Sequence, residues 1–314
     1  MNPPWSVIFL TTLIGMGQGL FLALYAGEVY YFFSVSNGNP VQMSLMGSAL
    51  VLALLGLGLI ASIFHLGRPE RAWRAVSQWR TSWLSREVIA LLLFLIIVLV
   101  WGGIKLTLYG AEGNLFGFLI GLLAAVLAIF LYICTAMIYV AIKCIKEWHT
   151  PLTVVNYLLL GLASGLTLAV LLSSHFQSDM VSIYINWTVF FMTLAFMSSV
   201  LSLYRNANLH KDAEFNTALG VKTGSIRHIS SSKVERSFGA HEFFHRASLN
   251  AVFWLKIFFP IAAFLLPMAF ISASLIYGDG MLITAVIIQY VGLLAERWLF
   301  FAQVKHPQNI YQQP

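Results

Sequence analysis

The stretch Leu84–Leu108, LSREVIALLLFLIIVLVWGGIKLTL, decides the class of fold. It exceeds the roughly 20 apolar residues that an α-helix needs to cross a hydrocarbon core about 30 Å thick. The whole chain of 314 residues shares this character, because 59% of its residues are hydrophobic, only 10% are charged, and its mean hydropathy is +0.82. A soluble domain carries about 25% charged residues. The composition therefore predicts an all-α integral membrane protein and excludes soluble enzymes.

Seven further apolar runs accompany this one. Together they predict an eight-transmembrane-helix bundle that forms a single domain over residues 1–314. Because the number of spans is even, both termini are expected on one side of the membrane. Several runs are long enough that tilt, or helix ends outside the lipid, must be expected. The runs are Trp5–Phe33, Val41–Phe64, Leu84–Leu108, Leu115–Ile142, Leu152–Leu172, Ile183–Tyr204, Ala247–Ile276 and Met281–Ala302.

The positive charges are distributed unevenly between the connections. The chain has 18 Lys and Arg against 12 Asp and Glu, a net charge of +6. The basic residues gather in and beside the second, fourth and sixth connections and in the tail, whereas the opposite side has only Lys105, and Lys256 and Arg297 lie within spans. Positive residues mark the cytoplasmic side. We therefore expect a multi-pass membrane protein with cytoplasmic termini, a basic cytoplasmic loop at 205–246, and a first run that is retained rather than cleaved.

The densest polar segment, FHLGRPERAWR at 64–74, follows the second run. Its Trp and Arg residues alone would suit an interfacial anchor, and a short surface helix is expected after Pro69. His65 and Glu87 suggest more, because an ionisable group at the end of a span needs a partner or access to water. A membrane quinone exchanges two electrons and two protons, and His and carboxylate side chains can transfer those protons. The sequence therefore predicts a quinone site that includes His65 and Glu87.

Two other polar groups lie on the same predicted side. His149 comes just before Pro151, which begins the fifth span, and it is interpreted either as a pocket residue or as a side chain that hydrogen-bonds to the backbone. Glu296 and Arg297 lie in the cytoplasmic half of the last run, where a charged pair marks either a site or a structural bridge. Glu28, near the outer end of the first run, is expected to be paired or to reach the interface.

Three patterns point to chemistry that the rest of the chain does not support. HEFFH at 241–245 matches a zinc-protease pattern, but no third ligand stands out. The glycines at 15, 17 and 19 follow no strand, so they are expected to allow close helix packing rather than to bind phosphate. No histidine pair lies in mid-membrane to hold haem, and two cysteines are too few for an iron–sulfur cluster. We expect no haem, no iron–sulfur cluster and no zinc in this chain.

The polar segments together resemble the membrane-anchor subunits of the dimethyl sulfoxide reductase family. The resemblance covers nearly the whole chain. The sequence of these segments is most similar to that of sulfite dehydrogenase anchors, followed by dimethyl sulfoxide reductase anchors. The similar segments are HLGRP (65–69), RAWR (71–74), SQWR (77–80), SWLSRE (82–87), WHTPL (148–152), NYLLLGLASG (156–165), EFFH (242–245), ERWLFF (296–301) and HPQN (306–309).

This resemblance implies a haem-free, quinone-reactive anchor that leaves the sulfur chemistry to its partners. The partners would be a four-cluster ferredoxin-like iron–sulfur subunit and a molybdopterin catalytic subunit on the cytoplasmic face. Electrons would reduce ubiquinone or menaquinone during sulfite oxidation, or leave menaquinol in a dimethyl sulfoxide reductase. The implied residues for quinone binding and proton transfer are His65, Glu87, Arg71, Arg80, Trp79, Ser85 and His149, and those for partner contact are Arg68, Arg74 and His245.

One alternative comes from another class of protein. A secondary transporter would use intramembrane charges such as Glu28 and Glu296, and such proteins commonly show internal repeats around a midplane site. The polar residues here gather at one interface instead. Transport is therefore kept only as the alternative to the anchor.

Overall fold

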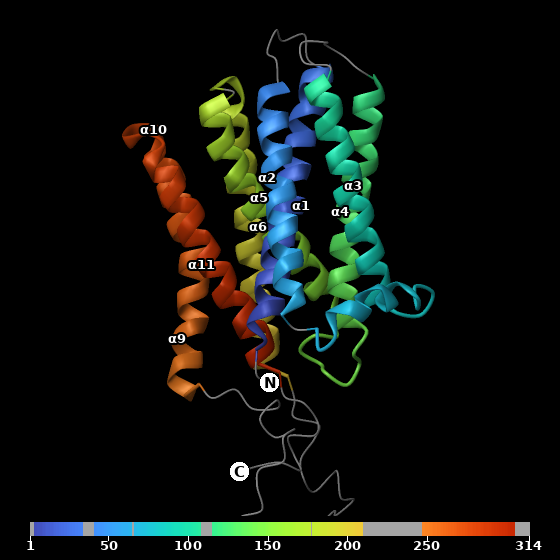
Figure 1. Ribbon diagram of the computed structural model, residues 1–314. Coiled ribbons are helices and arrows are strands. Elements are labelled where there is room, and N and C mark those ends of the chain that lie inside the picture. Colours follow the sequence, from blue (N-terminus) through green and yellow to red (C-terminus); the bar gives the residue numbers. More distant parts are fainter. Residues whose placement is uncertain are drawn as a thin grey trace, which may run out of the picture.

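The chain folds into long, nearly parallel and antiparallel helices that stand side by side (Figure 1). In this computed structural model the described residues are 3–33, 41–64, 66–107, 115–176, 178–209 and 247–304. Over these ranges the secondary structure is helical and without strands. The elements are α1 (Trp5–Phe33), α2 (Val41–Ile63), η1 (Pro69–Val76), α3 (Trp83–Thr107), α4 (Leu115–Val140), α5 (Pro151–Phe176), η2 (Ser178–Met180), α6 (Val181–Ala207), α9 (Leu249–Pro260), η3 (Ile261–Leu265), α10 (Leu266–Tyr277) and α11 (Gly280–Ala302).

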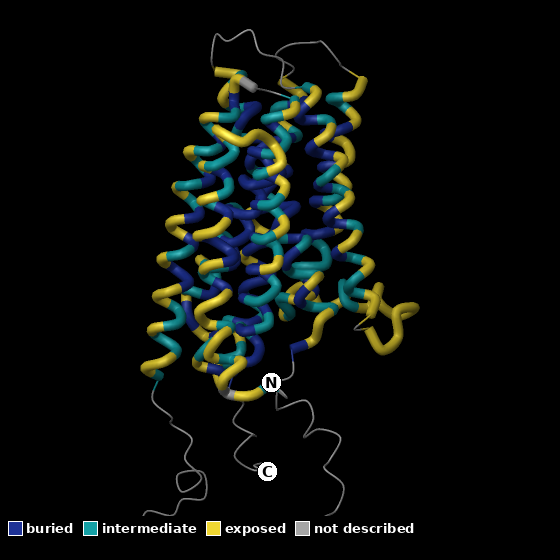
Figure 2. The backbone as a smooth tube through the Cα atoms, turned by 90° about the vertical axis from the view of Figure 1, so that its left-hand side faces the viewer, coloured by how far each residue is buried: buried dark blue, intermediate teal, exposed yellow. Residues whose placement is uncertain are grey.

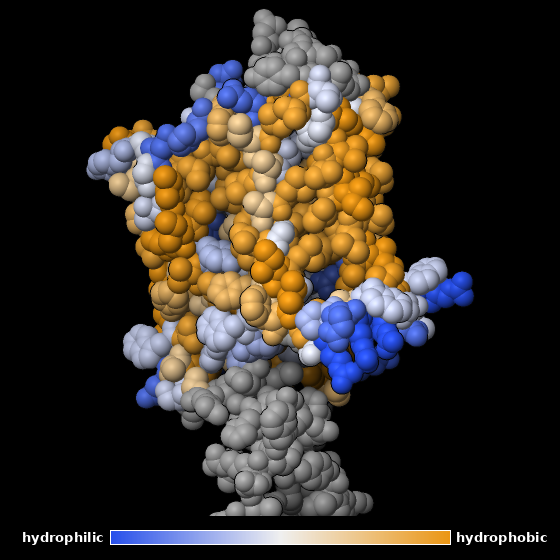
Figure 3. Space-filling view, viewed as in Figure 1, coloured by the Kyte–Doolittle hydropathy of each residue, from blue (hydrophilic) through white to orange (hydrophobic). Residues whose placement is uncertain are grey.

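Eight of the described helical segments are long and apolar enough to cross a membrane, which confirms the predicted bundle. Each lies within a few residues of a predicted run, and the seventh extends over Asn250–Tyr277. Figure 3 shows apolar side chains over the middle of the helices, as expected for a surface in contact with lipid. The chain is therefore a multi-pass membrane protein.

Two helices, α1 and α5, form the centre of the bundle. Figure 2 shows that buried residues lie toward the interior of the bundle and exposed ones toward its outside. In each of the two helices 67% of the most apolar window is buried, a larger share than in any other described span. The two helices cross at glycines. A Cβ added at Gly19 would lie 2.0 Å from the carbonyl oxygen of Gly161, and one at Gly165 would lie 2.1 Å from the backbone of Gly19 and Leu20. This contact confirms close packing at Gly19, whereas Cβ atoms at Gly15 and Gly17 would come no closer than 3.9 and 3.4 Å to a neighbour.

The seventh span is not one regular helix. Pro260 ends α9, and the five residues of η3 form a π turn before α10 continues the span. Proline removes a backbone donor and its ring clashes with the carbonyl four residues earlier, which for Pro267 in α10 is that of Ala263, so an irregular turn is expected there. On the facing helix, a Cβ at Gly292 would lie only 2.3 Å from the backbone nitrogen of Ala263. The glycine thus lets α11 pass directly against the π turn.

A short 3₁₀ helix, η1, projects from one end of the bundle (Figure 1). It begins at Pro69, a residue that suits the first turn because its missing N–H would have no partner there. This is the predicted surface helix, and hydrophilic side chains gather where it projects (Figure 3). Helix α1 begins and α11 ends at the same end of the molecule (Figure 1). We refer to it as the η1 end.

Candidate functional site

Glu87 lies one turn inside α3 and turns its carboxylate toward the interior. Its Oε1 accepts a hydrogen bond of 2.6 Å from the hydroxyl of Thr135 on α4. The neighbouring Arg86 points the other way, donating to the backbone oxygens of Trp79 at 2.9 Å and Arg80 at 2.7 Å. Adjacent residues of a helix point about 100° apart. At the start of α3, Arg86 therefore holds the preceding turn in place by hydrogen bonds, while Glu87 places a carboxyl group inside the bundle.

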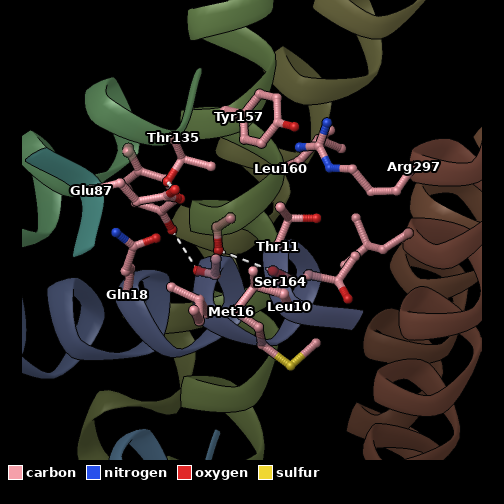
Figure 4. A pocket seen from close by; sticks show the side chains of 16 residues that line it. Leu10, Thr11, Met16, Gln18, Glu87, Thr135, Tyr157, Leu160, Ser164 and Arg297 are labelled. Atoms are coloured by element: carbon pink, nitrogen blue, oxygen red, sulfur yellow. Dashed lines mark hydrogen bonds between the residues drawn. The ribbon is translucent and has the colours of Figure 1, made fainter. Parts of the chain in front are cut away.

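Glu87 lines a cavity between α1, α3, α4, α5 and α11, which we call the Glu87 cavity (Figure 4). It encloses about 440 Å³ of space not filled by atoms, part of it open at the surface. The lining residues are Leu10, Thr11, Thr12, Ile14, Gly15, Met16, Gln18, Glu87, Tyr132, Thr135, Tyr157, Leu160, Gly161, Ser164, Leu293 and Arg297.

Two hydrogen bonds join α1 to α4 at the wall of this cavity. The amide of Gln18 donates to the backbone oxygen of Ala128 at 3.1 Å, and the hydroxyl of Tyr132 donates to that of Gly15 at 2.6 Å. These bonds use the Tyr132 hydroxyl and one of the two N–H groups of Gln18, and they leave the second N–H and the amide oxygen of Gln18 for a ligand. The cavity therefore combines apolar walls with a few fixed polar groups, the usual composition of a ligand site.

Arg297 reaches this cavity from α11, on the side opposite Glu87 in Figure 4. Its side chain is only 6% exposed, and its guanidinium carbon lies 3.7 Å from the centre of the Tyr157 ring. Its Nη1 is 3.4 Å from Oε2 of Glu296, which is also buried. A charge this deep needs such partners, and a cation over an aromatic face contributes about 0.5–2 kcal/mol. The Glu296–Arg297 pair is thus a structural bridge, and Arg297 also lines the Glu87 cavity, whereas its part in a site stays a prediction.

The predicted site residues are only partly brought together. Glu87 lines the cavity, whereas Ser85 is buried without lining it. His149 is exposed, its Nδ1 lies 2.6 Å from the backbone oxygen of Val140, and it lines neither described cavity. His65, His245 and the HEFFH segment lie outside the described residues. The exposed residues on and after η1 are Arg68, Arg71, Arg74, Trp79 and Arg80.

In this exposed segment, arginine side chains lie over neighbouring tryptophan rings. The guanidinium of Arg74 lies 5.5 Å from the ring of Trp73, and that of Arg80 lies 5.3 Å from the ring of Trp79. Such pairs hold positive charge and aromatic surface together at the η1 end. The segment therefore presents a basic, aromatic face to the surroundings and none of its arginines to the Glu87 cavity.

Several cavity residues were not predicted from the sequence. Gln18, Thr135, Tyr132 and Tyr157 are polar or amphipathic residues inside apolar runs, which is the signal that could have indicated them. The sequence did not show that these four side chains lie at the same level of the bundle, because they belong to three different helices. Only the fold shows that they meet.

The opposite half of the bundle holds a second buried charge pair. Lys105 of α3 donates to Oε1 of Glu28 on α1, and the two side chains are 14% and 9% exposed. The ammonium of Lys105 also lies 5.2 Å from the ring of Trp101. Glu28 is thus paired, as expected. Within the part of the chain that the structure describes, no three His, Cys, Asp or Glu side chains are grouped so as to hold a metal ion.

An apolar eight-span bundle with a polar cavity near one rim defines a membrane subunit rather than a catalytic domain exposed to water. Residues 1–302 match the family described as DMSO reductase anchor subunit (DmsC), and the chain belongs to this family. It is 42% identical over 322 aligned positions to the C subunit of sulfite dehydrogenase from Allochromatium vinosum, covering 100% of this chain and 99% of that protein.

More distant relatives carry the same family character. The chain is 26% identical to the C component of the anaerobic dimethyl sulfoxide reductase of Haemophilus influenzae, over 65% of this chain and 70% of that protein. It is 28% identical to YnfH, a component of an anaerobic dimethyl sulfoxide reductase of Escherichia coli, over 52% and 56% respectively. The resemblance noted in the sequence is confirmed. The chain is a membrane anchor subunit of a DMSO reductase family complex.

Proposed function

We propose that this anchor exchanges electrons between a partner iron–sulfur subunit and a membrane quinone that binds in the Glu87 cavity. The observation that carries this proposal is a carboxylate held by Thr135 inside a cavity with apolar walls. The side chains of Leu10, Ile14 and Leu160 can contact a flat ring. A protonated Glu87 and the second N–H of the Gln18 amide can donate to the two ring oxygens. These are the groups that a quinone head requires.

Glu87 is the residue proposed to transfer protons at the ring oxygen. Reduction of a quinone to a quinol takes up two electrons and two protons, and oxidation releases them. A carboxyl group within hydrogen-bond reach of the oxygen can donate or accept those protons. The Thr135 hydroxyl holds Oε1 of the carboxyl group, which leaves Oε2 available to the ligand. His65 remains the second predicted proton donor.

The direction of electron flow follows from the partner. Similarity to the sulfite dehydrogenase of Allochromatium vinosum favours sulfite oxidation, in which quinone is the acceptor. The alternative is an anchor whose partners reduce dimethyl sulfoxide and which oxidises menaquinol. The same cavity serves both directions, since the protons and electrons are the same.

The partner subunits are proposed to bind at the η1 end, on the cytoplasmic side. The exposed Arg68 and Arg74, with Arg71 and Arg80, give this end a basic surface that suits a soluble subunit with acidic groups. A four-cluster iron–sulfur subunit there would bring its terminal cluster to the end of the bundle that holds the Glu87 cavity. A molybdopterin subunit would bind beyond it and carry out the sulfur chemistry.

The test uses the assembled complex purified from membranes. Glu87→Gln should leave the complex intact and the oxidation of sulfite by an artificial dye unchanged. Its turnover with a short-chain ubiquinone or menaquinone analogue should fall by about 10²-fold, the lower end of what a positioned proton-transfer group contributes. The matched control is Glu70→Gln, an exposed glutamate on η1. Full quinone turnover in Glu87→Gln would refute the site.

A further inference from the structure

A second polar cavity lies beside the first, between α5, α6, α9 and α11. We call it the Asn156 cavity, and it encloses about 550 Å³ of space not filled by atoms, part of it open at the surface. Its outer lining comes from the η1 end, because Glu147 belongs to the connection before α5, Asn206 to the last turn of α6, and Gln303 to the residue after α11. The cavity thus runs inward from the end of the bundle that carries the polar connections.

Polar side chains continue along this cavity into the bundle. The Asn156 amide donates to the hydroxyl of Ser202 at 2.8 Å, and the hydroxyl of Ser198 donates to Oδ1 of Asn156 at 2.5 Å. In the same lining, the hydroxyl oxygen of Ser199 is buried without a protein hydrogen-bond partner among the described residues. Buried polar atoms of this kind are the ones that internal water satisfies.

The two cavities share a wall. Tyr157 and Arg297 line both of them, whereas Glu296 lines only the Asn156 cavity. At this wall the Tyr157 hydroxyl, Oε2 of Glu296 and Nη1 of Arg297 are buried without a hydrogen bond to a described group, although the last two atoms form the 3.4 Å ion pair. Three incompletely satisfied polar groups thus separate a polar channel from the carboxylate of Glu87.

We propose that the Asn156 cavity is the water-filled path by which protons reach the Glu87 cavity, with Glu296 as the relay at the shared wall. This inference rests on the proposed quinone function. Arg297 has a positioning role, because its charge holds the Glu296 carboxylate while its stacking on Tyr157 closes the wall to free passage of water. A carboxyl group that faces a hydrated cavity can take a proton from water and pass it on along hydrogen-bonded groups.

The number of protons that pass along this path must equal the number that the quinone reaction takes up or releases. One quinone reduced to one quinol takes two electrons from the partner iron–sulfur subunit and two protons from water at the η1 end. Protons can pass through Glu296 one at a time, because water at that end restores the carboxyl after each transfer. When quinol is oxidised, the same two protons leave along the same path.

The first test removes the titratable proton of the relay and keeps its shape. In the purified complex, Glu296→Gln should lower quinone-linked turnover by about 10²-fold, with the KM for the short-chain quinone analogue and the dye-linked activity unchanged. Formate is a weak acid small enough to enter a hydrated cavity, and it should restore most of the lost turnover. The control variant Gln289→Met changes a buried polar residue of the same helix that lines neither cavity, and its turnover should match the parent.

A second test narrows the path without removing any charge. Ser199→Val adds apolar volume in the Asn156 cavity and should slow quinone-linked turnover several-fold at unchanged quinone KM. The control Thr193→Val lies on the exposed face of the same helix and should have no effect. This variant keeps the inference testable if Glu296→Gln does not assemble.

The possible results separate the two proposals. Normal turnover in Glu296→Gln, a loss that formate does not reverse, or normal turnover in Ser199→Val would overturn the proton path. If Glu87→Gln is slow while Glu296→Gln is normal, the quinone site stands and the path fails. If Glu87→Gln is itself normal, the proposed quinone function fails.

Discussion

Replacing Gly165 by Ala should damage the whole bundle, because the crossing of α1 and α5 leaves no room for a side chain. A Cβ at this position would lie 2.1 Å from the backbone of Gly19 and Leu20, whereas ordinary van der Waals contact begins near 3.4 Å. The obstacle is backbone, so a rotamer change cannot relieve it. The helices would have to separate by roughly 1 Å, and overpacking of this kind costs about 1–3 kcal/mol or more.

The same displacement should reach the candidate site. Gly15 and Gly161 line the Glu87 cavity near this crossing, and the Tyr132 hydrogen bond to Gly15 depends on the position of α1. Gly165→Ala should therefore lower quinone-linked turnover in whatever complex survives, in addition to lowering its stability.

The assay is thermal stability in detergent, measured as the temperature at which half of the protein leaves its monodisperse elution peak. The matched control is Gly56→Ala, because nothing lies within 4 Å of a Cβ at Gly56, and Ala favours an exposed helix by up to about 1 kcal/mol. We expect the midpoint to fall for Gly165→Ala and to stay or rise for Gly56→Ala. Equal midpoints for the two variants would refute the reasoning about helix contact.

Three further changes have defined outcomes. Glu28→Gln leaves the ammonium of Lys105 buried without its charge partner, which should destabilise the protein by about 3–5 kcal/mol. Adding Lys105→Met should restore much of the thermal midpoint. A double variant no more stable than the single one would contradict this. Arg86→Ala removes two hydrogen bonds to the turn before α3, so limited proteolysis within residues 69–82 should become faster, and an unchanged rate would contradict the anchoring role. His149→Ala removes one hydrogen bond to backbone, so stability should fall by about 0.5–1.5 kcal/mol with quinone KM unchanged, and a raised KM would place the imidazole at the ligand.

The spans were predictable because the signal for a membrane helix is strong and local. A run such as Leu84–Leu108 has no competing interpretation, and glycines inside the first run could already be assigned to packing. Glu87 was singled out for a similar reason, since a carboxylate at the end of a span is costly without a function or a partner. It lines the cavity, and its role with quinone stays a prediction.

Which other residues line the cavity depends on how each helix is rotated about its axis and on how deep each residue lies in the bundle. The sequence of such helices reveals neither. A helix that is apolar on all sides has no periodic pattern to show which face is buried. Gln18, Thr135 and Tyr157 therefore could not be placed on one cavity until α1, α4 and α5 were packed together. The π turn in the seventh span was hidden likewise, because Pro260 and Pro267 predict a disturbance but not its form.

That π turn bears on how the span tolerates changes of length. A π turn holds one residue more than the α-helical turn that it replaces, so it has the form of a single inserted amino acid that the rest of the helix absorbed without rotating. Deleting one residue within 261–265 should let α9 and α10 join as continuous α-helix with their faces preserved. Helix α2 has no such extra residue, so deleting one residue from it would turn every following side chain by about 100°. This part of the chain is thus the place in the membrane where natural variation in length is expected to be least harmful.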